Sequence, residues 1–391
     1  MELLGRTKDI LGDLIAFPTV SRDSNLEMIA YLAEKLETAG AQVDIQLDLS
    51  GTKANLFATV GPDAPGGIVL SGHSDVVPVD DQPWSFDPFA MTEQDGLIYG
   101  RGSCDMKGFI AAATALADRF AGLELQRPVH FAFTYDEEIG CFGARALMQQ
   151  LEKREHKPAM VIIGEPTEMR IIEGHKGCYE YSTHFHGSEG HGSAPELGVN
   201  AVEYAVRYAA RLLELKDDLR GRADPMSRFN PPWTTVNLGA LTGGSAHNVI
   251  ASKARIDWEM RPVHSSDADF VKGQLEEYCT RHLLPAMQSV YPEAEIVTEV
   301  IGEMDGLEVV DENAARDLVA SLTGTNDADV VAFGTEAGIF QKCGMNVVVC
   351  GPGSIMQAHK ADEFLAESQL ASCLDMLEKL ADKLDRPAPR N

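Results

Sequence analysis

The sequence predicts an α/β fold into which a second domain, of ferredoxin-like α+β type, is inserted. Short apolar runs alternate with helical segments over the first ~175 residues, as is typical of a largely parallel sheet. Segment 178–302 instead follows the order β-α-β-β-α-β of a ferredoxin-like sandwich. The α/β alternation returns after residue 303, so the outer domain is expected to comprise 1–177 and 303–391.

The elements of the outer domain follow from the spacing of its apolar residues. Helices are expected where apolar residues recur every three or four positions, and strands where short apolar runs stand between turn residues. The expected helices span 3–17, 26–39, 106–120, 141–153, 312–322 and 367–384. The expected strands span 43–47, 55–60, 67–71, 129–135, 160–163, 329–333 and 345–350.

The inserted domain has its own sequence of elements. Its strands are expected at 178–185, 234–241, 253–261 and 295–301, and its helices at 200–215 and 268–282. The stretch 221–232 is rich in proline and glycine and is expected to form a long exposed loop.

The charge balance excludes some classes of partner. The 391 residues include 60 acidic and 33 basic side chains, a formal net charge of −27. Such a chain is repelled by phosphates and anionic lipids, so neither nucleic acid nor a membrane surface is an expected partner. No apolar run approaches eighteen residues and no signal peptide is evident, so a cytoplasmic location is expected.

The 7 cysteines are scattered, and none stands in a C-x-x-C pair. They therefore support neither a zinc knuckle nor a thioredoxin-type motif, and free thiols in a reducing compartment are expected.

Side chains that bind metals follow the apolar runs expected to form the sheet. They are His73 and Asp75, Asp105, Glu137 with Glu138, Glu165, and His359. In an open parallel sheet, ligands gather beyond the carboxyl ends of the strands, so these groups are expected to converge. Burying so many carboxylates together without a cation would be very costly. The mixed nitrogen and oxygen set, with no thiolate, suits zinc or cobalt.

The number of ligands fits two metal ions. Asp105 would bridge them, His73 and Glu165 would hold one ion, and Glu138 and His359 would hold the other. Asp75 is placed to orient the ring of His73. Glu137 is then left over beside a ligand, which suits the general base that takes a proton from water.

Five motifs resemble those of the metallopeptidase M20 family: Gly72–Pro78, Tyr99–Gly108, Asp136–Glu138, Gly164–Thr167 and Gly351–Ser354. They lie in the family's order along the chain. The resemblance implies a di-zinc aminopeptidase-like catalytic domain and an inserted dimerisation (lid) domain. It also implies two Zn²⁺ ions per subunit, with Co²⁺ able to substitute, a homodimer, and a cis peptide between Asp105 and Met106.

Finer features resemble the acetylornithine deacetylase branch of that family: Tyr135–Cys141, His175–Gly177, Phe333–Ala337 and Gln357–Phe364. This implies a small-molecule N-acyl amino acid substrate and removal of the acetyl group from N2-acetyl-L-ornithine, a step of arginine biosynthesis. By the same resemblance, His191 of the other subunit would support the oxyanion. Asn248, Arg261, Gly334 and Thr335 would bind the substrate, with Arg261 pairing with its carboxylate.

Other functions stay open. A hydrolase of the same family could act on N-acetylcitrulline, succinyl-diaminopimelate or a dipeptide instead. A non-catalytic metal-binding dimerisation protein is a second alternative, although the complete ligand set and Glu137 speak against it. A nucleotide-binding enzyme is a third, but no G-x-G-x-x-G sequence opens a helix after the first strand.

Overall fold

The computed structural model describes residues 2–385, which form two compact units. The described part of unit 1 comprises 2–174, 309–330 and 335–385, and unit 2 comprises His175–Glu308 and Val331–Gly334. The chain passes between units at 174/175 and 308/309, close to the boundaries expected from sequence at 177/178 and 302/303. It also enters unit 2 once more at 331–334, a crossing that the sequence pattern did not indicate.

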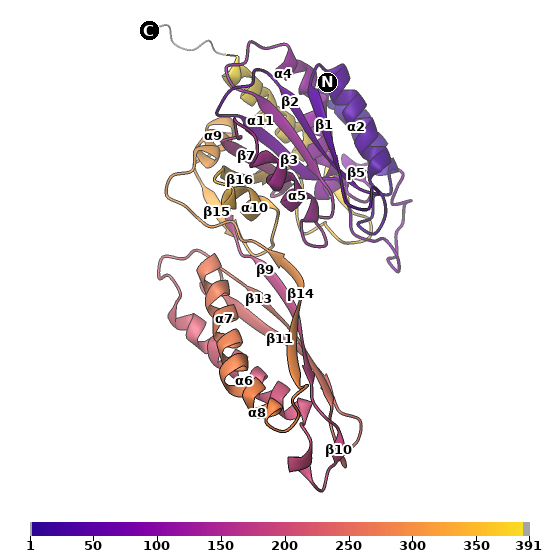
Figure 1. Ribbon diagram of the computed structural model, residues 1–391. Coiled ribbons are helices and arrows are strands. Elements are labelled where there is room, and N and C mark those ends of the chain that lie inside the picture. Colours follow the sequence, from indigo (N-terminus) through magenta and orange to yellow (C-terminus); the bar gives the residue numbers. More distant parts are fainter. Residues whose placement is uncertain (1, 386–391) are drawn as a thin grey trace. The chain divides into compact units, whose positions relative to one another are not determined.

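Unit 1 is built around an eight-stranded mixed sheet (Figure 1). Its middle strands β6, β3, β7 and β16 are parallel, and their apolar runs are buried because helices cover both faces. In sheet order the strands are β1 (Gln42–Leu47), β2 (Ala54–Val60), β6 (Val129–Thr134), β3 (Ile68–His73), β7 (Met160–Pro166), β16 (Asn346–Gly351), β8 (Ile171–His175) and β15 (Ala328–Val331). The predicted α/β class is confirmed.

Helices cover this sheet in two groups. The larger hydrophobic core includes residues of α1, α2, α3, α9 and α11, whereas α5 and α10 pack against each other. Helices α1, α2 and α11 present apolar residues at the three- to four-residue spacing that buries one face, whereas every residue of α3 is buried. Their bounds are α1 (Glu2–Ala16), α2 (Leu26–Thr38), α3 (Gly108–Ala115), α4 (Ala117–Ala121), α5 (Phe142–Leu151), α9 (Ala314–Thr323), α10 (Ala337–Lys342) and α11 (Glu367–Leu384).

The helix expected over 106–120 is interrupted in the structure. Ser103–Lys107 forms an irregular wide turn, and the backbone of Asp105 (φ −120°, ψ 91°) and Met106 (φ −136°, ψ 36°) is not helical. The amides of Cys104 and Asp105 donate to the side chain of Glu363 instead of to helical carbonyls. The spacing of apolar residues cannot predict such a long-range contact.

A small three-stranded sheet also escaped prediction. Its strands are only three residues long each, which is too short for a periodic pattern: β17 (Phe364–Ala366), β5 (Leu97–Tyr99) and β4 (Thr92–Gln94). Because β17 follows the loop that carries His359, this sheet attaches that loop to the segment before Asp105.

Unit 2 has an antiparallel four-stranded sheet with helices α6 and α7 on one face (Figure 1). Alternate residues of β9 and β13 are buried against these helices, giving the unit its own core. In sheet order the strands are β11 (Thr235–Gly243), β13 (Lys253–Arg261), β9 (Cys178–His186) and β14 (Glu295–Met304). The helices are α6 (Ala201–Gly221), α7 (Ser265–Tyr278) and α8 (Leu284–Gln288), and β10 (Gly190–His191) pairs with β12 (Val249–Ile250).

Among residues 2–385, no helix combines the length and the apolar character that crossing a membrane requires.

Candidate metal centre

His73 is the last residue of β3, the strand that lies between β6 and β7. Its ring is buried, and Nδ1 donates to the backbone oxygen of Asp75 at 2.9 Å. That hydrogen bond directs the other nitrogen, Nε2, toward two carboxylates: it lies 3.0 Å from Oδ1 of Asp105 and 3.6 Å from Oε1 of Glu165. His73 therefore turns its second ring nitrogen toward a cluster of carboxylate oxygens.

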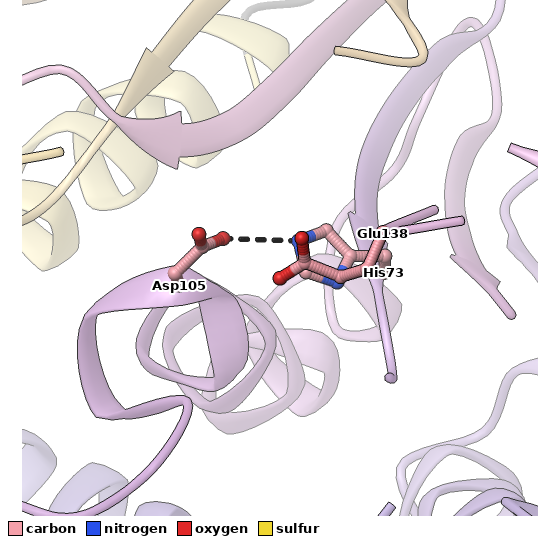
Figure 2. Close-up of side chains that lie close together, drawn as sticks. All are labelled: His73, Asp105 and Glu138. Atoms are coloured by element: carbon pink, nitrogen blue, oxygen red, sulfur yellow. Dashed lines mark hydrogen bonds and ion pairs between the residues drawn. The ribbon is translucent and has the colours of Figure 1, made fainter. Parts of the chain in front are cut away.

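Asp105 lies between two imidazoles. Figure 2 shows its carboxylate facing the ring of His73. Its other oxygen, Oδ2, lies 3.4 Å from Nε2 of His359. The peptide bond between Asp105 and Met106 is cis, as the family resemblance implied. A carboxylate whose two oxygens face two different imidazoles has the arrangement of a bridging ligand.

Glu138 completes the second half of the cluster. Its Oε2 lies 3.1 Å from Nε2 of His359. His359 sits in a loop with a left-handed backbone (φ 62°), and 53% of its side chain is exposed, unlike that of His73 at 1%. The two ends of the cluster thus differ in their access to solvent.

Glu137 lies beside the predicted ligands His73 and Glu165. Its side chain is buried, and one of its oxygens lies within 4.8 Å of ligand atoms of His73 and Glu165. Its backbone N–H donates to Oδ1 of Asp75 at 3.0 Å. The N–H of Glu138 donates to Oδ2 of Asp75 at 3.3 Å, so one carboxylate holds the turn that carries both glutamates.

Asp75 orients the ring of His73 through its backbone oxygen rather than through its carboxylate. The ring donates to the backbone oxygen of Asp75, whereas the nearest carboxylate oxygen lies 3.7 Å from Nδ1. That carboxylate is used mainly by the 137–138 turn and by the hydroxyl of Ser21, which donates at 2.7 Å.

The cluster concentrates negative charge in a buried place. Burial raises the pKa of Glu165 well above its usual value, and the charge of Asp105 adds to that rise. Burial opposes protonation of His73, yet its hydrogen bond to Asp105 and the charge of Glu165 raise its pKa well above the ordinary range. Hydrogen bonds to Asp105 and Glu138 raise the pKa of His359 to about 10. These shifts indicate a site that favours a bound positive charge.

The donor set fits divalent metal ions. The ion pairs that described residues make to Asp105, Glu138 and Glu165 come from the two histidines, and no lysine or arginine supplies them. Imidazole nitrogens with carboxylate oxygens suit zinc or cobalt. Cys104 is not part of the cluster, because its thiol donates to the backbone oxygen of Ser354.

His191 and Asn248, two of the other predicted site residues, lie close together in unit 2. The N–H of Gly192 donates to the backbone oxygen of Asn248 at 2.8 Å, and His191 pairs with Val249 in the β10–β12 ribbon. The ring of His191 is exposed, and its Nδ1 lies 2.7 Å from the hydroxyl of Ser193.

Arg261 ends strand β13 and is half-buried. Its guanidinium contacts Glu259 at 2.8 Å, so it is already paired within unit 2. A substrate carboxylate at this position would therefore compete with or join Glu259.

Gly334 and Thr335 lie at a crossing between the units, with Gly334 in unit 2 and Thr335 in unit 1. A Cβ at Gly334 would lie 2.5 Å from the sulfur of Met304, so a larger residue there would require the Met304 side chain to move. Thr335 is buried, and its hydroxyl accepts the N–H of Ala337, the first residue of α10.

Two supporting residues were missed from sequence. Glu336 is buried and accepts hydrogen bonds from Ser71 (2.6 Å) and Thr134 (2.7 Å), on the strands that lead to His73 and Glu137. Its position in the motif 333–337 was the only feature of the sequence that could have indicated its role. No feature of the sequence indicated Ser21, because its contact with Asp75 joins residues that lie 54 positions apart in the chain.

Comparison with known proteins supports one family. Residues 69–383 match the family model described as peptidase family M20/M25/M40. The chain is 34% identical over 365 residues to an acetylornithine deacetylase of Shigella sonnei, covering 91% of this chain and 92% of that protein. It is also 34% identical over 382 residues to an acetylornithine deacetylase of Pasteurella multocida, covering 94% and 95%.

Solved structures share the fold. Aminopeptidase PepT from Bacillus cereus has a TM-score of 0.73 at 18% identity, covering 98% of this chain and 99% of that one. The M20 family metallo-carboxypeptidase Sso-CP2 from Sulfolobus solfataricus has a TM-score of 0.71 at 18% identity, covering 97% and 99%. The family model, the relatives and the buried cluster of histidines and carboxylates agree: this chain belongs to the M20 family of metal-dependent hydrolases.

Proposed function

We propose that this protein removes the acetyl group from N2-acetyl-L-ornithine, giving L-ornithine and acetate. The observation that carries the proposal is the position of Asp105 between His73 and His359, with the carboxylate of Glu137 beside His73 and Glu165. We assign Glu137 the role of base rather than of ligand. The choice of substrate is supported by 34% identity over more than nine-tenths of the chain to proteins named acetylornithine deacetylase.

Two zinc ions would be held by this chain's own side chains. His73 and Glu165 would hold one, Glu138 and His359 the other, and Asp105 both. When bound, zinc supplies Lewis acidity, which polarises an amide carbonyl and lowers the pKa of water toward ~7.

Glu137 would act as the general base. It would take a proton from the attacking water and later deliver it to the departing α-amine of the substrate. Its burial suits this role, because burial raises the pKa of Glu137 well above that of an exposed glutamate. The hydrogen bond from its N–H to Asp75 holds the backbone of the base in place.

Most of the remaining roles would fall to unit 2 and to a dimer formed through it. We propose that the chain forms a homodimer through unit 2, in which the partner subunit's His191 would support the negative oxygen of the tetrahedral intermediate. Asn248 and Arg261 would bind the substrate α-carboxylate, the latter by exchanging part of its contact with Glu259. Gly334 and Thr335 would line the substrate site.

A reconstitution experiment tests the reaction and the substrate together. The chelated protein is supplied with Zn²⁺ or Co²⁺, and product release is measured from N2-acetyl-L-ornithine, N-acetylcitrulline and succinyl-diaminopimelate. Metal-dependent turnover with acetylornithine clearly preferred is expected. Preference for another substrate would support metal-dependent amide hydrolysis but contradict acetylornithine as the substrate. Two bound metals with no turnover of any substrate would contradict the enzymatic function itself.

A further inference from the structure

A buried carboxylate that is not a metal ligand holds the backbone beside Asp105. Glu363 is 1% exposed, and its two oxygens accept four hydrogen bonds. Oε1 accepts the N–H groups of Cys104 (2.9 Å) and Asp105 (3.0 Å). Oε2 accepts the N–H of Gly102 (3.0 Å) and the guanidinium of Arg101 (2.7 Å). Each oxygen of the Glu363 side chain therefore accepts from two donors.

Arg101 extends the same arrangement to the segment that follows β3. Its guanidinium is 1% exposed and lies over the ring of Trp84. Besides Glu363, it donates to the backbone oxygens of Lys360 (3.2 Å) and Pro78 (3.3 Å). It also donates to the side-chain oxygen of Gln82 at 2.6 Å.

Gln82 carries the connection to His359. Its amide nitrogen donates to the backbone oxygen of His359 at 3.0 Å, while its oxygen is held by Arg101. The buried pair of Arg101 and Glu363 therefore joins three loops, 78–84, 101–105 and 359–363, through hydrogen bonds to their backbones and to Gln82.

The two proposed metal sites share Asp105 but differ in what supports their other ligands. His73 and Glu165 lie within strands β3 and β7, whose ladders hold them. Asp105 and His359 lie in an irregular turn and in a loop, outside any strand or regular helix. For these two ligands the hydrogen bonds of Arg101 and Glu363 take the place of a strand.

We propose that Arg101 and Glu363 are positioning residues that set the affinity of the second metal site, formed by Asp105, Glu138 and His359. The inference rests on the proposed two-metal function. Neither residue touches the metal ions or the substrate; Glu363 acts through the backbone of Asp105, and Arg101 acts through Gln82 on His359. Supporting groups of this kind typically change metal affinity by roughly 10- to 100-fold.

The test is a Zn²⁺ titration of chelated protein, in which two binding constants are obtained by competition with a chromophoric chelator. Glu363→Gln turns one acceptor oxygen into a donor facing other donors. It is expected to weaken the second zinc by roughly 10- to 100-fold and the first by less. Asp362→Asn is the matched control, because the carboxylate of Asp362 accepts the N–H of Ser85 and not that of a proposed metal ligand. This variant should bind both ions normally.

A second variant covers the case in which Glu363→Gln does not fold, which thermal unfolding of the metal-free protein would reveal. Gln82→Leu removes the contact to His359 at a partly exposed position without burying a charge. It is expected to weaken the second zinc selectively, by a smaller factor. Cobalt substitution gives an independent readout, since one Co²⁺ per subunit should lack the magnetic coupling of a carboxylate-bridged pair.

The outcomes separate this inference from the proposed function. Wild-type protein that binds fewer than two metal ions would contradict both. Wild-type protein that binds two, together with folded variants that bind both ions as tightly or lose both equally, would overturn the positioning role alone. Selective loss of the second ion in folded variants would support it.

Discussion

The carboxylate of Asp75 accepts the backbone N–H of Glu137 at 3.0 Å, which links the strand that carries a proposed zinc ligand to the proposed general base. The same carboxylate accepts the N–H of Glu138 and the hydroxyl of Ser21. Asp75 therefore positions a turn in which base and ligand are neighbours, in addition to holding the ring of His73 through its backbone oxygen.

Asp75→Asn is expected to lower kcat by roughly 10- to 100-fold with little change in KM. The amide would place a donor against one of the N–H groups of the 137–138 turn, so Glu137 would lose its defined position. Steady-state kinetics with saturating Zn²⁺ measures kcat and KM separately. Unchanged kcat with a raised KM would contradict the positioning role.

Glu137→Ala is expected to keep both metal ions and to lose kcat by roughly 10²- to 10⁴-fold. The proposed ligand set does not include Glu137, whereas the proposed proton transfer from water requires a base there. Metal content and turnover are measured on the same sample. Glu34→Ala, at an exposed position of α2, is the control and should keep both the metal ions and the turnover. Substantial remaining turnover would exclude Glu137 as the base.

His191→Ala and Glu137→Ala are expected to complement each other in mixed dimers. Each variant alone should be severely impaired, but a mixed dimer contains one site with an intact Glu137 and an intact His191 from the other subunit. The measurement is activity after the two variants are unfolded and refolded together, against each refolded alone. Absence of recovery in verified mixed dimers would argue that His191 does not act across subunits.

His130 is expected to make the protein less stable in acid. Burial, with a smaller effect of Arg154, lowers the pKa of His130 to about 3. Between pH 6.5 and pH 3 the unfolded chain therefore binds a proton that the folded chain does not, so stability falls as the pH falls through this window. At pH 4.5 the loss is about 2–3 kcal/mol.

His130→Asn tests this expectation, since an amide can keep the contact that Thr59 makes at 2.9 Å. The variant is expected to be less stable than the wild type at pH 7.5, because a ring that stacks on Phe57 is lost. It should nevertheless lose less stability between pH 6.5 and 4.5, as measured by urea unfolding. Parallel pH profiles for the two proteins would refute the assignment.

Gly164 is expected to tolerate no side chain. It precedes the ligand Glu165 in β7, and a Cβ there would lie 1.9 Å from Cγ of Phe109. Gly164→Ala should lower the free energy of unfolding by about 1–3 kcal/mol or more, because the ring must move within a packed core. Gly5→Ala in α1 is the control: nothing lies within 4 Å of its Cβ, so a gain of up to about 1 kcal/mol is expected. Equal urea midpoints for the two variants would contradict this argument.

Much of the fold was predictable because it depends on local patterns. The helix over 367–384 and the strands that end near His73 and Glu138 follow from apolar spacing, and the structure has them within a few residues. The α/β class is confirmed for the same reason: parallel buried strands require continuous apolar runs. The three-residue strands around β5 and the break after Ser103 were not predictable, since neither produces a periodic pattern.

The candidate ligands were also visible in the sequence, since the carboxyl ends of parallel strands share one edge and metal-binding side chains stand at four such ends. The sequence by itself determined which groups could meet: two imidazoles, a set of carboxylates and one spare glutamate.

Only the tertiary structure decided how those groups are held. Glu363 lies 258 residues from Asp105 along the chain, and Gln82 lies 277 residues from His359. Such hydrogen bonds depend on where separate loops lie once the sheet has formed, and no local propensity encodes them. The same is true of the two oxygens of Asp105, whose distances of 3.0 Å and 3.4 Å to different imidazoles exist only after residues 73, 105 and 359 have come together.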